Sequence, residues 1–367
     1  MTTKRFRYRL SQRIRRIMRR ISRAFIGSSK AARLDIETET IRKILLVRAN
    51  FRMGNSVLAA PAISIFRNKF PNAKIDLVGA PISANLFQGF PIDQHFSVTR
   101  RFPDCLWHYP ALIKQLRSAR YDLAVELSCS QSALGAFVVG LSQARFRVGL
   151  RGEWGRWYNV RIPRPQERNK YKSLPAFLEA LGLNAVESLP SLALSAAEQE
   201  EAKKRIQASI TYPERPVVGV FVGGRKTGDK RWPVKNFLEL IARLYRQGNN
   251  VVTFFGPEEK KLMPLFTDAL DHGVALVFEP SPRKFAGLVS NCDLFVSCDS
   301  GPMHLACAVG TRVVAIFEKQ NFDRWGPPPG MARIVHQSGG CSVDEVLKAC
   351  ELEISPAVGS LLEVDPN

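Results

Sequence analysis

The segment Cys298–His304 carries the strongest signal for chemistry in this sequence. It follows an apolar stretch typical of a buried strand and opens a predicted helix, in which Pro302 suits the first turn. Asp299 or Ser300 can cap that helix, and Gly301 lets a ligand approach the backbone closely. The N–H groups and the dipole at a helix N-terminus bind anions, so we expect a diphosphate site here. An ordinary capped helix is the alternative interpretation.

A second candidate, Gly223–Pro233, also stands at the end of a predicted strand. Its glycines and four basic residues, Lys230 among them, form a cationic loop that can clamp phosphates. The segment lacks the Walker phosphate-loop pattern. Glu258 and Glu259 follow the next predicted strand, where a carboxylate can bind a pair of ribose hydroxyls. Both features also occur in ordinary solvated turns and helix starts.

Near the beginning of the chain, Arg48–Ser56 joins the first predicted strand to its helix. Gly54 permits a turn there, and Asn55 stands where a polar side chain would face a cleft. No GxGxxG segment occurs, which excludes the common nicotinamide dinucleotide fingerprint. No GxSxG elbow occurs either, so nothing indicates the serine triad of that hydrolase class.

Short apolar stretches alternate with helical patterns in two successive sets, which predicts parallel βαβ units. The predicted strands are 41–47, 74–78, 121–127, 146–149, 216–222, 250–255, 293–297 and 311–317. Residues 150–172 are expected to form an exposed or cleft-facing loop. We therefore predict an α/β protein with two Rossmann-like domains, 41–190 and 191–367, that face a central cleft. The last helix, within 341–362, could return across the cleft to the N-terminal domain.

Length and composition agree with that division. The 367 residues exceed what one compact core usually holds. Hydrophobic residues make up 45% and charged residues 23%, which excludes a wholly disordered chain. No run of about eighteen apolar residues is present, so we expect no membrane-spanning helix. The seven cysteines show no CxxC pair and no metal-ligand spacing, which favours reduced thiols and no metal site.

The net charge of +20 is concentrated near the N-terminus, where twelve basic residues precede the first acid, Asp35. On a helix, six large apolar side chains between Leu10 and Phe25 fall within an arc of roughly 100°, opposite six arginines. Residues 1–40 therefore form a predicted basic amphipathic arm, whose segment 4–33 would bind an anionic membrane surface. A disordered tail, a nucleic-acid arm and a transit peptide are the alternatives.

Four segments together resemble glycosyltransferase family 9, the heptosyltransferase family of lipopolysaccharide core synthesis. They are 48–62 with its Gly54-Asn55-Ser56, the triplet 147–149, the tetrapeptide 230–233 and the segment 299–306. The resemblance covers residues 41–335 and implies a GT-B fold. It also implies an acceptor on the N-terminal domain and an ADP-heptose-type donor on the C-terminal domain. Transfer would invert the anomeric centre, with neither a metal nor another cofactor.

The resemblance assigns roles by position. Lys230 would neutralise the donor phosphates, which makes it a catalytic residue as well as a binding one. Glu258 or its neighbour would bind the donor ribose. The diphosphate and the sugar would be held by Asp299, Ser300, Gly301, Pro302, Met303 and His304.

One position departs from the family pattern. The family commonly carries an aspartate after the first glycine, read as the base that deprotonates the acceptor hydroxyl, whereas this chain has Asn55. An amide cannot take up that proton, although it can orient the acceptor. Glu126, at the end of the third predicted strand, is the preferred substitute base, ahead of Asp104 and Glu153. Glu126 can equally be a structural carboxylate that pairs with a neighbouring arginine.

The leading hypothesis is an inverting glycosyltransferase that adds heptose or a similar sugar to a lipid-linked saccharide. It would work in the cytoplasm, on the cytosolic face of the inner membrane, because the arm suits an acceptor that stays in the bilayer. A non-catalytic protein that binds sugar nucleotides or saccharides is the alternative, which Asn55 suggests. Nucleic-acid binding explains none of the motifs in the body of the chain.

The arm hypothesis makes a direct prediction. Deleting residues 1–34 should release the protein from anionic liposomes, because most of the excess positive charge and the apolar stripe are removed together. Donor binding should persist, since the motifs of the two domains are untouched. Liposome sedimentation at moderate salt measures the first effect. If the truncated protein still sediments with the vesicles, the arm is not the anchor.

Overall fold

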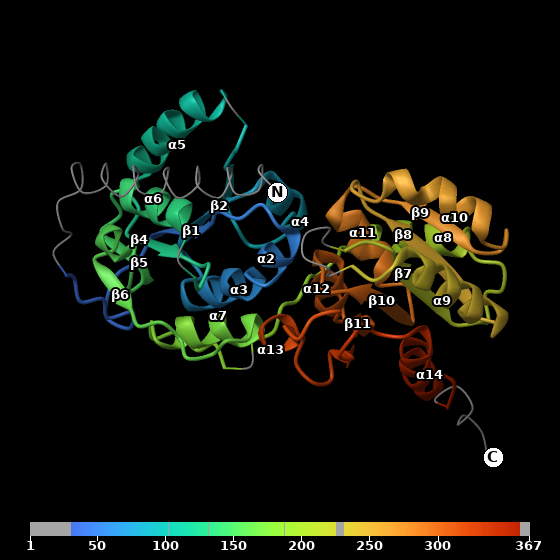
Figure 1. Ribbon diagram of the computed structural model, residues 1–367. Helices are drawn as coiled ribbons and strands as arrows, with labels where there is room; N and C mark the ends of the chain where they lie inside the picture. Colours follow the sequence, from blue (N-terminus) through green and yellow to red (C-terminus); the bar gives the residue numbers. More distant parts are fainter. Residues whose placement is uncertain (1–30, 102, 131, 187, 225–230, 360–367) are drawn as a thin grey trace, which may run out of the picture.

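The computed structural model describes residues 31–359, apart from 102, 131, 187 and 225–230. Residues 1–30, which include most of the predicted arm, lie outside the described part. Within it, two parallel sheets of six strands each form two α/β domains, blue to green and yellow to red in Figure 1. The prediction of two Rossmann-like domains is therefore confirmed.

The N-terminal sheet has the strand order β3-β2-β1-β4-β5-β6, and all neighbouring strands are parallel. Its strands are β1 (Lys43–Arg48), β2 (Lys74–Gly79), β3 (Gln94–Ser97), β4 (Leu123–Glu126), β5 (Phe146–Leu150) and β6 (Val160–Ile162). The helices are α2 (Met53–Val57), α3 (Ala60–Lys69), α4 (Pro81–Leu86), α5 (Cys105–Ala119), α6 (Ala133–Leu141) and α7 (Lys170–Glu179). The strand order reverses between β1 and β4, where folds of this kind open a crevice.

The C-terminal sheet repeats this topology in the order β12-β11-β10-β7-β8-β9. Its strands are β7 (Val217–Phe221), β8 (Asn250–Phe255), β9 (Ala275–Phe278), β10 (Leu294–Cys298), β11 (Arg312–Ile316) and β12 (Ala332–Val335). The helices are α8 (Ala196–Gln207), α9 (Val234–Arg246), α10 (Met263–Ala269), α11 (Pro282–Val289), α12 (Gly301–Ala308), α13 (Phe322–Trp325) and α14 (Val343–Gly359). The reversal lies between β7 and β10, so the segments after these two strands meet at one edge.

Two expectations about local structure are wrong. The edge strands of both sheets, β3, β6, β9 and β12, were not among the predicted strands, because they are short and only partly buried. The segment 150–172 is not simply an exposed loop. It contains β6, and its aromatic residues Trp154, Trp157 and Tyr158 are buried in the core of the N-terminal domain.

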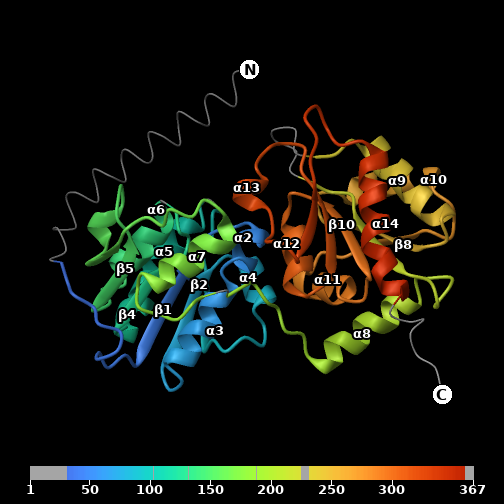
Figure 2. The ribbon, with the colours of Figure 1, turned by 90° about the horizontal axis from the view of Figure 1, so that it is seen from below.

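The last helix stays with the C-terminal domain. α14 packs against α9 and against strands β10, β11 and β12. Figure 2 shows it beside β10 and α9, away from the N-terminal sheet. Its inner face buries Val346, Leu347 and Cys350 in the same core as α9. The return to the N-terminal domain that we considered is therefore not what the described residues do.

The two domains meet along α2 and α4 on one side and α11 and α12 on the other (Figure 1). Gly54 and Gly301 lie so close that a Cβ on Gly301 would be 3.2 Å from the Gly54 nitrogen. Farther along, the buried Arg283 donates to the Leu86 carbonyl (3.2 Å), and its backbone N–H donates to Asn85 Oδ1 (3.2 Å). Backbone contact and hydrogen bonds thus hold the domains together.

Among the described residues, no helix is both long enough and apolar enough to cross a bilayer.

Candidate active site

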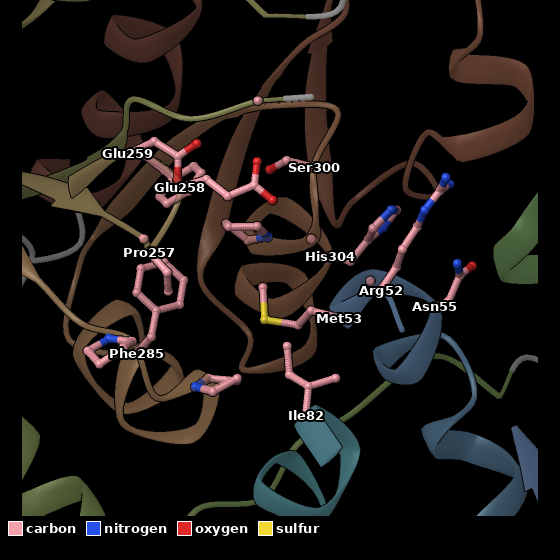
Figure 3. Close-up of a pocket in the computed structure, with 18 of the residues that line it drawn as sticks. Arg52, Met53, Asn55, Ile82, Pro257, Glu258, Glu259, Phe285, Ser300 and His304 are labelled. Carbon is pink, nitrogen blue, oxygen red and sulfur yellow. The ribbon is translucent and has the colours of Figure 1, made fainter. Parts of the chain in front are cut away.

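A cavity of about 480 Å³ lies between the two domains (Figure 3). The N-terminal domain lines it with the segment that follows β1, from Phe51 to Asn55, and with Ile82 of α4. The C-terminal domain lines it with the ends of β7, β8 and β10. Helices α11, α12 and α13 contribute as well. The lining residues of this domain include Phe221, Gly224, Glu258, Glu259, Phe285, Asp299, Ser300, Gly301, Pro302, His304 and Trp325. The two crevices at the strand-order reversals therefore open into one site.

The N-terminus of α12 forms the C-terminal wall. Ser300 is the N-cap residue, but its side chain makes no capping hydrogen bond and instead contacts the Ser297 hydroxyl (3.0 Å). Asp299 Oδ2 accepts a hydrogen bond from Asn321 (2.8 Å). The side-chain cap that Ser300 could have supplied is therefore absent from α12. A helix end without a side-chain cap leaves first-turn N–H groups to an external anion.

Arg231 adds a cation beside this helix. Its Nε and Nη2 atoms are buried and have no hydrogen-bond partner among the described residues. Its backbone and side chain lie against Gly224, which lines the cavity. The next residue, Trp232, is fully buried and donates from Nε1 to the Cys341 carbonyl (2.8 Å), which fixes this segment to the domain core. Lys230, the predicted phosphate ligand, lies outside the described residues.

Carboxylates and aromatic rings line the part of the cavity near β7 and β8. Glu258 is exposed, whereas Glu259 is 5% exposed, and both line the cavity. A Cβ on Gly223 would lie 2.8 Å from Glu259 Cδ, so the Glu259 carboxylate sits at the end of β7. Phe221 and Phe285 pack edge to face, with centroids 6.0 Å apart, and supply an apolar surface next to these acids. An apolar wall with a few polar groups is typical of a small-molecule site.

Asn55 lies on the opposite wall and is held by its neighbours. Its Oδ1 accepts a hydrogen bond from Arg48 Nη2 (3.2 Å), and its Nδ2 donates to Asn50 Oδ1 (3.1 Å). Arg48 Nε also donates to the Asn55 carbonyl (3.0 Å). Burial lowers the pKa of Arg48, and the charge of Glu126 opposes that effect. The prediction that Asn55 faces the cleft agrees with this placement.

Glu126 lies beneath the site rather than in it. It is 1% exposed, is not among the cavity-lining residues, and accepts hydrogen bonds from the Ser128 hydroxyl (2.6 Å) and N–H (3.2 Å). Burial raises its pKa to about 7, although Ser128 and Arg48 favour the charged form. Asp104 and Glu153 do not line the cavity either. The geometry thus fits the structural interpretation of Glu126 better than the role of base.

His304 belongs to α12 and contacts both domains. It is 4% exposed and lines the cavity, and its Nδ1 is hydrogen-bonded to the Tyr171 hydroxyl of α7 (2.6 Å). A Cβ on Gly54 would lie 2.7 Å from His304 Cδ2, so the ring also packs on the loop that carries Asn55. Met303, by contrast, is fully buried and does not line the cavity, so its placement does not support the donor contact predicted for it.

The structure brings most of the predicted residues together and adds others. Asn55, Glu258, Asp299, Ser300, Gly301, Pro302 and His304 share one cavity. Arg52, Arg231 and Tyr171 were not singled out from the sequence. The position of Arg231 directly after Lys230 was a usable signal, whereas nothing in the sequence pairs Tyr171 with His304. No cluster of three or more potential metal ligands occurs in the described part of the chain.

The raised pKa of Glu126 predicts a dependence of stability on pH. The folded protein keeps this proton up to about pH 7, whereas an ordinary carboxyl in the unfolded chain loses it near 4.5. The unfolded state therefore binds fewer protons between these values, and the free energy of unfolding falls as the pH rises, by at most about 3 kcal/mol.

Glu126→Gln should remove this contribution, because an amide oxygen can still accept from Ser128 but cannot ionise. Urea unfolding at about pH 5 and about pH 8 compares the two proteins. If the free energy of unfolding falls equally in the parent and the variant between these two pH values, Glu126 is not the group that titrates.

Comparison with known proteins identifies the family of this chain. The model for glycosyltransferase family 9 (heptosyltransferase) matches residues 109–352. Lipopolysaccharide heptosyltransferase 2 of Escherichia coli K12 is 27% identical over 316 residues, which cover 80% of this chain and 87% of that protein.

Solved structures show the same fold. A family 9 glycosyl transferase from Veillonella parvula superposes with a TM-score of 0.75 at 17% identity, over 90% of this chain and 99% of that one. The E. coli ADP-heptose lipopolysaccharide heptosyltransferase II gives a TM-score of 0.71 at 22% identity, over 86% and 99%. The predicted GT-B architecture is thereby confirmed. This chain belongs to glycosyltransferase family 9, the heptosyltransferase family, and is a glycosyltransferase.

Proposed function

We propose that the protein transfers a sugar, heptose in the first instance, from an ADP-linked donor to a lipid-linked saccharide such as lipopolysaccharide core, with inversion at the anomeric carbon. The observation that carries this proposal is the pairing of two features: a helix N-terminus whose N-cap residue, Ser300, makes no capping hydrogen bond, and Arg231, whose Nε and Nη2 atoms are buried and have no hydrogen-bond partner among the described residues. Both stand beside the same cavity. Such a combination suits a diphosphate that must leave with its negative charge stabilised.

The remainder of the C-terminal wall suits a nucleoside. Phe221, Pro257 and Phe285 offer an apolar surface for a base, and Glu258 or Glu259 offers a carboxylate for ribose hydroxyls. The choice of ADP is supported by relatives rather than by this wall. An E. coli heptosyltransferase whose structure was solved with ADP superposes with a TM-score of 0.68 at 18% identity, over 85% of this chain and 99% of that one.

The N-terminal side suits an anionic acceptor. Lys170 Nζ donates to the Cys129 carbonyl at the end of β4 (3.4 Å). Burial lowers the pKa of Lys170, and the positive charges of Arg324, Arg48 and Arg164 lower it further, so several cations gather here. Phosphate or carboxylate groups on a saccharide would relieve this repulsion. We expect a single displacement that needs no metal ion, in which the protein's own cations and the α12 N-terminus stabilise the departing diphosphate.

A non-catalytic binding protein is the second candidate, and one observation favours it. The Asn55 amide is engaged on both sides, by Arg48 and by Asn50, and cannot take up a proton. A protein that only bound a sugar nucleotide would tolerate this arrangement. It would bind donor and acceptor without forming a glycosidic bond.

The donor class can be tested without an acceptor. A thermal-shift panel of ADP, UDP, GDP and CMP on the chain lacking residues 1–34 should show a selective rise with ADP, because a ligand that binds only the folded state stabilises it. A rise in melting temperature with UDP or GDP instead would agree with a glycosyltransferase but contradict an ADP-linked donor. No response to any nucleotide would contradict the proposed donor site. Release of ADP from ADP-heptose with heptose-free lipopolysaccharide as acceptor then separates transfer from binding.

We further propose that the N-terminal domain contacts the membrane through α5. On this helix Trp107 is 80% exposed and Leu106 is 55% exposed. Arg100, Arg101 and Lys114 around them are exposed as well. Figure 1 shows α5 standing out from the sheet at the edge of the domain. Apolar side chains bordered by cations suit the headgroup region of an anionic bilayer.

The α5 contact connects the membrane with the active site. The guanidinium of Arg100 lies over the Phe51 ring, 4.1 Å from its centroid, and Phe51 lines the cavity. A bilayer beneath α5 would therefore present a lipid-linked acceptor close to the mouth of the site.

Replacing Leu106 and Trp107 by serine in the full chain should weaken partition onto vesicles that contain phosphatidylglycerol. The expected loss is roughly tenfold, because two partly inserted apolar side chains contribute about 1–2 kcal/mol. Leu352→Ser is the matched control, since Leu352 is 49% exposed on the C-terminal domain. Vesicle sedimentation measures both. If the double variant and the parent partition equally onto the vesicles, the proposed membrane contact of α5 is wrong.

A further inference from the structure

The base that deprotonates the acceptor must be a titratable group on the cavity wall, close to where the two substrates meet. Asn55 holds the expected place but is an amide. Glu126 lies beneath the wall, with both oxygens bonded to Ser128. Glu258 and Glu259 lie at the ends of β7 and β8, on the side that suits the nucleoside. Asp299 accepts a hydrogen bond from Asn321, and Glu279 pairs with Arg205 (2.8 Å). Among the described residues that line the cavity, His304 is a titratable side chain that contacts both domains.

The ring of His304 lies where a base is needed. It belongs to the first turns of α12, just behind the helix end that suits the diphosphate. Its Cδ2 edge, which adjoins Nε2, packs against Gly54, the residue before Asn55. Figure 3 shows His304 with Ser300 on the C-terminal side, facing Arg52 and Asn55 of the N-terminal domain. The imidazole therefore stands between the donor wall and the acceptor wall.

A hydrogen bond joins the Tyr171 hydroxyl to Nδ1 of His304, and the tautomer of the ring decides which of the two atoms donates. Beyond Tyr171, the hydrogen bonds end at the Met331 carbonyl, which can only accept, and there the Cys307 thiol donates (3.8 Å). The Cys307 sulfur, a weak acceptor, is hydrogen-bonded to the Tyr171 hydroxyl. When the Tyr171 hydroxyl donates to this sulfur, its oxygen accepts from Nδ1–H of His304 (2.6 Å). With the proton on Nδ1, the lone pair of a neutral imidazole is on Nε2.

Tyr171 is well placed to keep that arrangement. It is 2% exposed, and burial raises the pKa of its hydroxyl well above the usual 10, so it remains a neutral phenol. The preceding Asn169 caps α7 by accepting from the Tyr171 N–H (2.8 Å) and donates to the Gly326 carbonyl of the other domain (2.9 Å). The start of α7 is thus fastened to the C-terminal domain at the point where Tyr171 meets His304.

From this geometry we propose that His304 is the general base of the transfer reaction and that Tyr171 is its positioning residue. The inference rests on the proposed glycosyl transfer. Nε2 takes the proton of the acceptor hydroxyl while that oxygen forms the new bond to the anomeric carbon of the donor. The bond between that carbon and the diphosphate oxygen breaks, and its electron pair leaves with the nucleoside diphosphate. The imidazolium then returns its proton to solvent.

His304→Asn is the principal test, because the asparagine amide can still donate toward Tyr171 but cannot accept a proton. We expect kcat for ADP release from ADP-heptose, with heptose-free lipopolysaccharide, to fall by a factor of about 10²–10⁴. The melting temperature without ligand should remain within a degree or so of the parent, which shows that the variant folds. Imidazole added to His304→Ala should restore part of the lost turnover.

Two further variants distinguish the roles. Tyr171→Phe removes the hydrogen bond that selects the tautomer, so it should lower kcat more than it changes KM and should shift the acidic limb of the pH profile. A merely structural role would not move that limb. Glu126→Gln tests the rival base, and turnover within a few fold of the parent agrees with the position of Glu126 outside the cavity.

The outcomes separate this inference from the proposed function. If the parent turns over and His304→Asn keeps this turnover within a few fold, His304 is not the base. The proposed glycosyl transfer is unaffected by that result. Turnover abolished by Glu126→Gln but not by His304→Asn overturns the base assignment in favour of Glu126. A parent that binds ADP but releases none from ADP-heptose contradicts the proposed transfer, and the base assignment falls with it.

Discussion

The approach of Gly54 to Gly301 is the contact on which the site depends. A Cβ on Gly301 would lie 3.0 Å from Met53 Cε and 3.2 Å from the Gly54 nitrogen. The backbones of α2 and α12 therefore touch with no side chain between them, and both residues are glycine because of this closeness rather than because of an unusual φ. This contact sets how far the donor wall stands from the acceptor wall, and it places the His304 ring against the Gly54 loop.

Behind that contact, the acceptor wall is organised around one buried cation. Arg48 binds both oxygens of Asn55, and burial lowers its pKa while Glu126 opposes that effect. Arg48 in turn acts on Glu126, because its positive charge limits how far burial raises the Glu126 pKa. An amide at position 55 adds no further negative charge to this interior. Arg48 and Glu126 thus stabilise each other's charged form, and the loop that carries Asn55 is held to the end of β1.

The sequence predicted the interior of both sheets and missed their edges. Central strands such as β1 and β10 are continuous apolar runs, since helices cover both faces, and such runs are easy to recognise. β3, β6, β9 and β12 have three or four residues each and are only partly buried, so no apolar run distinguishes them from loops. The buried aromatic residues at 154, 157 and 158 were misjudged because amphipathic rings occur equally in loops and in cores.

The site was predictable where it is local and unpredictable where it joins distant segments. The end of β10, with Ser300 and Gly301, carries its own signature, since a strand, a glycine turn and a helix start follow each other within one motif. Tyr171 and His304 are 133 residues apart and belong to different domains, so only the docking of those domains pairs them. Glu126 is separated from the cavity by neighbours in its own domain, such as Ser128 and Gly135, although its place at the end of a central strand had suggested a base. The imidazole of His304 and the hydroxyl of Tyr171 belong to different domains, so they form a functional unit only when the two domains meet. The contact between Gly54 and Gly301 is therefore as necessary to the chemistry as the imidazole itself.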